Sequence, residues 1–190
     1  MKKLIKYLVL SFAGCFLIIL SSCGDRACLV KIDDFNITAV DFSKTPNRDT
    51  NAAINKDSLG FSFSPNTSLV GKKHKSCYMT IVDNPVISIS IKTLFDYSDG
   101  FLANSDVTTF FQVGSRHNHF DDWKFITIDE LVDNFVKNKE NNYASLLDEF
   151  YFILFLKDDT CKGGQQKFEI TIVLSDGTVL IKQTDDLLFE

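Results

Sequence analysis

The sequence predicts a mainly β protein, a single β-sandwich (Ig-like or related) with one amphipathic helix around residues 128–138. Two observations favour this fold. Short segments in which apolar and polar residues alternate recur from residue 28 to the C-terminal end, and a single segment has apolar residues at helical spacing. We find no internal repeat, low-complexity tract or linker in residues 28–190, so we expect one β-rich domain there.

Alternation and turn residues predict the individual strands. The clearest strand follows Pro85, with Ile87, Ile89 and Ile91 expected on its buried face. Asp176-Gly177 predicts a tight turn between the last two strands. The polar segment 43–76, interrupted by Pro and Gly, is expected to be the loosest part of the chain. The predicted strands are 28–42 (bulged near Asp33-Asp34), 59–63, 77–82, 86–95, 107–113, 149–157, 167–174 and 179–183.

The helix has both a start signal and an apolar stripe. Thr127 and Glu130 have the spacing of a capping box, and Ile126 and Leu131 stand where a hydrophobic staple would pack. Apolar residues then recur along one face at helical spacing: Ile128, Leu131, Val132, Phe135 and Val136.

The N-terminal 22 residues have the pattern of a secretory signal. Lysines at positions 2, 3 and 6 precede an uncharged apolar run at 8–20, which is shorter than the ~20 residues that a transmembrane helix needs. The run ends in Leu20-Ser21-Ser22-Cys23, which resembles the lipobox of bacterial lipoproteins. The resemblance implies cleavage of residues 1–22 and lipidation of Cys23, which with residues 24–27 would form a membrane tether. Multiple acyl chains would give stable anchoring.

Charge and the residue after the cysteine bear on partners and location. Cleavage would remove three of 20 basic side chains and none of the 25 acidic ones, so the mature charge would be -8 (17 minus 25). A chain with this charge and no basic cluster is not expected to bind nucleic acid. Gly24 stands where an Asp would signal inner-membrane retention, which favours the outer membrane, on a face that the sequence leaves undetermined.

Two parts of the chain resemble a known family. The segments NPVISISIKT (84–93) and DYSDG (96–100), and the tail from QKFEI (166–170) through LSDG (174–177) to residue 184, look like a family of uncharacterised Bacteroidetes lipoproteins. The resemblance covers most of residues 77–189. It implies a bacterial envelope lipoprotein and brings no catalytic residue or cofactor with it.

Few residues suggest chemistry. If residues 116–123 are extended, His117, His119 and Asp121 lie on one side and would form a set of metal ligands; the alternative is a polar surface loop. Trp123, the single Trp, is a candidate for ligand stacking. Ser58, in Asp57-Ser58-Leu59, resembles a Bacteroidetes O-glycosylation acceptor. The acidic pairs are better explained as solvated charges than as Ca²⁺ ligands, since adjacent strand residues point to opposite faces; they are Asp33-Asp34, Asp158-Asp159 and Asp185-Asp186.

Three cysteines would remain in an oxidising compartment: Cys28, Cys77 and Cys161. They allow three pairings with one thiol left over. We favour Cys28 with Cys77, because each opens a predicted strand and Cys161 lies in a polar, Gly-rich segment. Closing a loop of about 50 residues would stabilise the fold by ~4 kcal/mol. In the alternative without this bridge, Cys77 is a buried core thiol.

The sequence therefore predicts a non-catalytic, membrane-tethered binding or structural module of the cell envelope, with no cofactor, whose partner is an envelope protein or a glycan. The first alternative is a metal-dependent protein or enzyme that uses His117, His119 and Asp121. The second is a glycan-binding surface lipoprotein.

Overall fold

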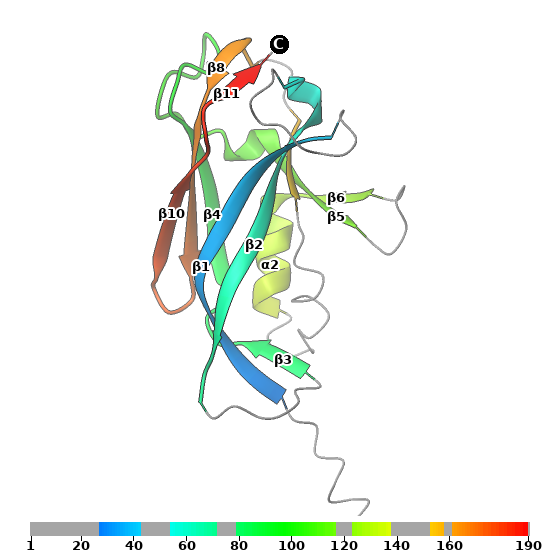
Figure 1. Ribbon diagram of the computed structural model, residues 1–190, viewed down its shortest axis with the longest axis vertical. Coiled ribbons are helices and arrows are strands. Elements are labelled where there is room, and N and C mark those ends of the chain that lie inside the picture. Colours follow the sequence, from blue (N-terminus) through cyan, green and yellow to red (C-terminus); the bar gives the residue numbers. More distant parts are fainter. Residues whose placement is uncertain are drawn as a thin grey trace, which may run out of the picture.

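Strands dominate the computed structural model, which describes residues 27–42, 54–71, 79–116, 123–137, 153–157 and 161–189 (Figure 1). One sheet has six strands in the order β3-β1-β2-β7-β5-β6: Met79–Val82, Ala27–Asp41, Leu59–Leu69, Ile153–Leu156, Phe111–Arg116 and Trp123–Ile126. A second sheet has the order β10-β9-β4: Val179–Gln183, Phe168–Leu174 and Val86–Thr93. The remaining described elements are the β11-β8 pair (Leu187–Phe189, Gly164–Gln166), helix α2 (Ile128–Lys137) and the 3-10 helices η1 (Lys56–Ser58) and η2 (Thr108–Phe110).

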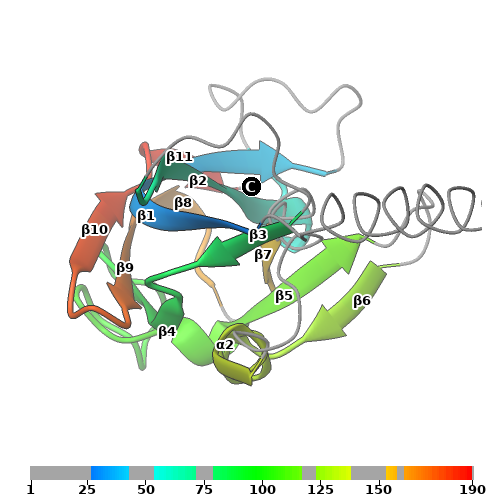
Figure 2. The same cartoon turned by 90° about the horizontal axis from the view of Figure 1, so that it is seen from below.

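The two larger sheets and α2 enclose one core. Seen from below, the three-stranded sheet lies on one side, the curved six-stranded sheet on the other, and α2 lies between β4 and β5 (Figure 2). The ring of Phe168, on β9, lies 5.5 Å from that of Phe61 and 5.6 Å from that of Phe111, both on the six-stranded sheet. All three side chains are almost fully buried, so aromatic packing joins the sheets. The predicted β-sandwich-like class is confirmed.

The long β1–β2 ladder contains the predicted bulge. β1 pairs antiparallel with β2 along most of its length, and the register shifts between Ile32 and Asp34. At its N-terminal end β1 also pairs with β3, in parallel, from Ala27 to Val30. Lys182 on β10 donates to Asp34 at 2.7 Å, which links the three-stranded sheet to β1. An inward-directed lysine on an edge strand also discourages pairing with another chain.

The predicted capping box begins α2. The Thr127 amide donates to Oε2 of Glu130 at 2.8 Å, and the Glu130 amide donates to Oγ1 of Thr127 at 3.1 Å. These reciprocal bonds satisfy amides that have no partner inside the helix. Ile128, Leu131 and Phe135 of the predicted apolar stripe are buried.

Three expectations are corrected by the structure. Segment 43–76 is not uniformly loose, because β2 extends through Pro65 to Leu69. Proline has no amide hydrogen to donate, but β7 pairs with β2 only from Gly60 to Ser62, so no hydrogen bond from Pro65 to β7 is lost. Ile87 is 42% exposed, because a register irregularity between Val86 and Ser88 buries Val86 instead.

The strand predicted at 107–113 begins only at Phe111. Asp106 accepts hydrogen bonds from both the amide and the hydroxyl of Thr108, at 2.8 and 2.6 Å, and these local bonds favour the turn η2 over a strand.

Candidate functional site

Several predicted site residues lie outside the described residues. These are Cys23, Cys77, the metal-ligand candidates His117, His119 and Asp121, and the pair Asp158-Asp159. Trp123 is the first residue of β6, a strand that the sequence analysis does not predict, and only its backbone is described. Within the described ranges, no three His, Cys, Asp or Glu side chains gather as metal ligands would. Nor does this part of the chain contain a helix with the length and apolarity of a bilayer span.

Ser58 lies in η1, and its hydroxyl is already engaged. Its single proton is shared between Oδ1 of Asp41 at 2.7 Å and the backbone oxygen of Asn55 at 2.8 Å. Asp41 is buried, so the first bond gives a donor to one oxygen of a carboxylate that is largely removed from water. A glycosylated Ser58 would no longer donate either bond, and its modification stays a prediction.

The acidic pairs serve separate local contacts. Asp33 accepts from Ser68 on β2 at 3.1 Å, whereas Asp34 binds Lys182 on β10, and this hydrogen bond lowers the pKa of Asp34. Asp186 pairs with Lys167 at 3.2 Å. Neighbouring acids are thus directed to different partners rather than to one shared ligand.

Two cysteines are described in full. Cys28, 4% exposed, forms a disulfide whose partner lies outside the described residues. The β1–β3 ladder pairs Ala27 with Met79, so the chain that follows Cys77 runs beside the strand that carries Cys28. The pairing of Cys28 with Cys77 stays a prediction. Cys161, which sequence analysis places in a polar segment, keeps a thiol and packs in the core.

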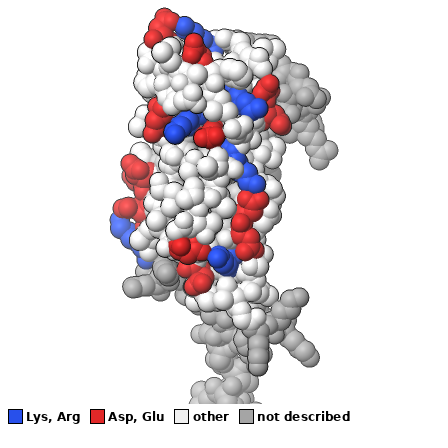
Figure 3. Space-filling view, turned by 90° about the vertical axis from the view of Figure 1, so that its left-hand side faces the viewer, with Lys and Arg blue, Asp and Glu red and all other residues white. Residues whose placement is uncertain are grey.

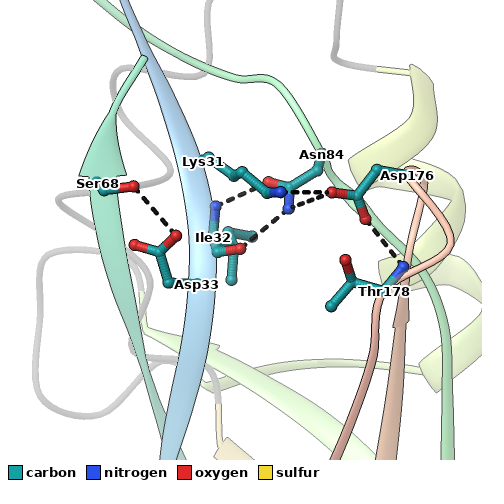
Figure 4. Close-up of polar contacts among 7 residues, drawn as sticks. All are labelled: Lys31, Ile32, Asp33, Ser68, Asn84, Asp176 and Thr178. Atoms are coloured by element: carbon teal, nitrogen blue, oxygen red, sulfur yellow. Dashed lines mark hydrogen bonds and ion pairs between the residues drawn. The ribbon is translucent and has the colours of Figure 1, made fainter.

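A polar cluster joins β1 to the β9–β10 turn (Figure 4). Asn84, 1% exposed, accepts from the Ile32 amide at 2.7 Å and donates to the Ile32 carbonyl at 3.0 Å, beside the β1 bulge. Asp176 accepts from Asn84 at 3.3 Å and pairs with Lys31 at 3.1 Å. Hydrogen bonds from Thr178, together with Lys31, lower the pKa of Asp176. Because these polar groups bind one another, we interpret the cluster as structural.

The outer face of the three-stranded sheet carries mixed charge. Figure 3 shows acidic and basic side chains interspersed around an uncharged centre. Two apolar side chains of β10 point outward there, Val179 and Ile181, which are 54% and 56% exposed. This face has no concentrated patch of one sign.

A different surface combines one exposed and two half-buried aromatic rings with polar side chains. On the outer face of the six-stranded sheet, Phe155 of β7 is paired in register with Gln112 of β5 on one side and with Gly60 of β2 on the other. Side chains of paired antiparallel residues point to the same face, so these three positions face away from the core. Phe125 of β6 belongs to the same face, since its partner Gly114 lies two residues after Gln112.

Three phenylalanine rings form a connected surface there. The ring of Phe155 lies 4.8 Å from that of Phe42 and 5.5 Å from that of Phe125, in the second case edge to face. Phe42 covers Gly60: a Cβ at that position would lie 2.5 Å from Cε2 of Phe42. Phe125 is 51% exposed, although large aromatic side chains normally gain stability from burial.

Beside these rings lies a hollow of about 230 Å³, called here the outer-face pocket. It is lined by Asp57, Gln112, Phe125, Phe155, Leu156 and Lys157. No side-chain hydrogen bond or ion pair joins Asp57, Gln112 or Lys157 to any part of the chain that the structure describes. Their backbones are held in place: the Asp57 amide donates to Asn55, and the Lys157 amide to the Phe110 carbonyl at 2.8 Å. The backbone around the pocket is therefore held in place, while the side chains of its three polar residues are available to hydrogen-bond a ligand.

Sequence analysis missed this pocket, because phenylalanines at alternating strand positions are usually core residues. One signal was present. The four residues of β7, Ile153 to Leu156, are all apolar, yet only Leu154 and Leu156 are buried. Apolar residues on both faces of a strand indicate that its second face is also covered, here in part by the rings of Phe42 and Phe125 around Phe155.

Comparison with protein-family models, with curated proteins and with solved structures finds no match to this chain.

Proposed function

We propose that this protein is a lipid-anchored lipoprotein of the bacterial cell envelope whose folded domain binds a ligand without transforming it. The observation that carries the binding role is the outer-face pocket, in which the exposed ring of Phe125 and the half-buried ring of Phe155 adjoin three polar side chains that form no hydrogen bond or ion pair with a described side chain. Small-molecule sites typically combine an apolar wall with a few polar groups in this way.

Exposure of the polar groups favours binding over catalysis. Asp57 and Lys157 are exposed, so water solvates their charges. Catalytic electrostatics depends on groups held in a water-excluded site, where charge interactions are much stronger than in water. The lining residues are better suited to hydrogen-bonding a solute than to stabilising a transition state.

The location of the pocket relative to the proposed anchor supports the same role. Cys23 precedes the first residue of β1 by four positions, so the anchored end would be held within ~14 Å of the start of that strand. The 15 residues of β1 would span about 45 Å if straight. Phe42 follows β1, and its amide donates to the Ser58 carbonyl, next to Asp57 (Figure 1). The pocket would thus be presented at the end of the domain far from the membrane. We propose that this membrane is the outer membrane, as the residue after Cys23 favours.

Membrane partition tests the anchor. Cys23→Ser or Cys23→Ala should move the protein from the detergent phase to the aqueous phase, because it lacks the thiol that carries the lipid. A variant that fractionates with membranes as the wild type does would contradict the anchor.

Assays for turnover test the non-catalytic role. We expect no conversion of a panel of glycans, peptides and esters. Turnover that a single substitution in the chain abolishes would contradict this part of the proposal.

A further inference from the structure

We infer that the outer-face pocket binds a single ring of an uncharged saccharide, packed against Phe125 and Phe155. This inference rests on the proposed binding function and specifies its ligand. It is carried by three features of the described residues: the aromatic wall, the chemistry of the polar groups around it, and the size of the pocket.

The aromatic wall suits the face of a sugar ring. One face of a pyranose presents several C–H groups, which carry partial positive charge. The face of an aromatic ring is negative, so the two attract in addition to burying apolar area. Phe125 is 51% exposed and stands edge to face with Phe155 at 5.5 Å. Because Phe42 supports Phe155 from the other side at 4.8 Å, the wall loses little side-chain freedom when a ligand binds.

The polar groups match hydroxyls rather than a charged ligand. The carboxylate of Asp57 only accepts hydrogen bonds, the ammonium of Lys157 only donates them, and the amide of Gln112 does both. A sugar hydroxyl is also both donor and acceptor, so neighbouring hydroxyls can use all three groups. One positive and one negative charge leave the lining with no net charge, so the lining as a whole does not favour an anionic or a cationic ligand over a neutral one.

The size of the pocket limits its occupant. At about 230 Å³ it lies below the ~300–1,000 Å³ typical of sites for drug-sized ligands. It accommodates one ring and leaves the rest of a longer glycan in solvent. A site of this kind is expected to bind a monosaccharide weakly, with a Kd of about 1 mM. A multivalent glycan would bind more tightly to a membrane that carries many copies.

Ligand-observed NMR and calorimetry on the full mature chain in detergent test the inference. The probes are the methyl glycosides of glucose, galactose and mannose, N-acetylglucosamine, the anionic sugar glucuronate, and short neutral peptides containing Phe or Leu. We expect at least one neutral sugar to bind, and Phe125→Ala to raise its Kd about five- to tenfold.

Two further variants keep the test independent of folding. Phe95→Ala removes a phenylalanine that is 37% exposed and does not line the pocket, so binding should be unchanged. Asp57→Ala removes an exposed carboxylate that has no described side-chain partner, and should weaken binding about two- to fivefold without lowering the Tm.

The possible failures are distinct. Binding of glucuronate or of a peptide, but of no neutral sugar, in a manner that Phe125→Ala weakens, would overturn the saccharide inference and leave the proposed binding function intact. A neutral sugar whose Kd is unchanged by both Phe125→Ala and Asp57→Ala would overturn the assignment to this pocket. If no probe binds at all, both the inference and the binding role of the pocket are wrong.

Discussion

Asn84 provides the sharpest test of the fold, because one buried side chain satisfies both backbone groups of Ile32. It accepts from the Ile32 amide at 2.7 Å and donates to the Ile32 carbonyl at 3.0 Å (Figure 4). Ile32 itself stays in register with Thr67 of β2, and the β1–β3 ladder on the other side of β1 ends at Val30 and Val82, two residues before Asn84. The Asn84 side chain therefore supplies the hydrogen-bond partners that Ile32 would otherwise lack beyond the end of β3.

Asn84→Ala would leave a donor and an acceptor without partners in a site that is 1% exposed. An unsatisfied buried group costs ~1–3 kcal/mol, so the two together should lower the free energy of unfolding by about 3 kcal/mol. For a domain of this length, each kcal/mol corresponds to a shift in Tm of ~2–4 °C. We therefore expect the Tm to fall by about 6–12 °C, as measured by circular dichroism, with a matching fall in the urea midpoint.

The control is Asn36→Ala. Asn36 lies on the same strand, but its side chain is exposed and bonds only to the exposed side chain of Asn66, at 3.4 Å. This substitution should change the free energy of unfolding by less than about 0.5 kcal/mol. Equal midpoints for the wild type and Asn84→Ala would refute the argument that Asn84 compensates for the end of the β1–β3 ladder, and so would equal losses in the two variants.

Three further outcomes are expected. Non-reducing peptide mapping should link the Cys28 and Cys77 peptides, and losing that bridge should cost ~4 kcal/mol; a Cys28 peptide linked to any other cysteine contradicts the pairing. The pKa of Asp176 is lowered in the folded state, so its stabilising contribution is present above about pH 4 and is lost as pH falls further. The difference in free energy of unfolding between the wild type and Asp176→Asn should therefore shrink between pH 7 and pH 3. A difference that stays constant over this range would exclude stabilisation by the ionised Asp176. Gly60→Ala should lower the urea midpoint by an amount equivalent to ~1–3 kcal/mol, because the added Cβ would clash with the Phe42 ring. Gly100→Ala should leave the midpoint unchanged, because its added Cβ meets nothing within 4 Å. Equal midpoints for the two variants would mean that the Phe42 ring moves aside without loss of stability.

Much of the fold follows from local sequence signals. The capping box at Thr127 and Glu130, the Asp176-Gly177 turn and the bulge in β1 are each visible within a few residues, and all are present in the structure. Such features succeed as predictors because their stabilising interactions are formed between near neighbours in the chain.

Elements that depend on distant partners were missed or misplaced. β8 and β11 have three residues each, which is too short for alternation to identify, and they form by pairing with each other across 20 residues of chain. The continuation of β2 through Pro65 depends on where β7 ends. Neither fact can be read from the local pattern.

The candidate site belongs to this second group. Its lining comes from η1, β5, β6 and β7, which are separated by up to 100 residues of sequence. Sequence periodicity gives the two faces of a strand but does not say which one meets the core, so Phe125 and Phe155 could not be distinguished from core phenylalanines such as Phe61.

The sequence by itself determined the predominance of strands and both the position and the apolar face of α2. It also predicts a signal with a lipobox. Each of these depends on a contiguous stretch of chain. Only the tertiary structure decided that β7 turns Phe155 outward, that Phe42 covers Gly60, and that Asp57 and Lys157 meet at one pocket. The physical reason is that burial and exposure are properties of the packed sheets, and register between strands assigns them only once distant segments have come together.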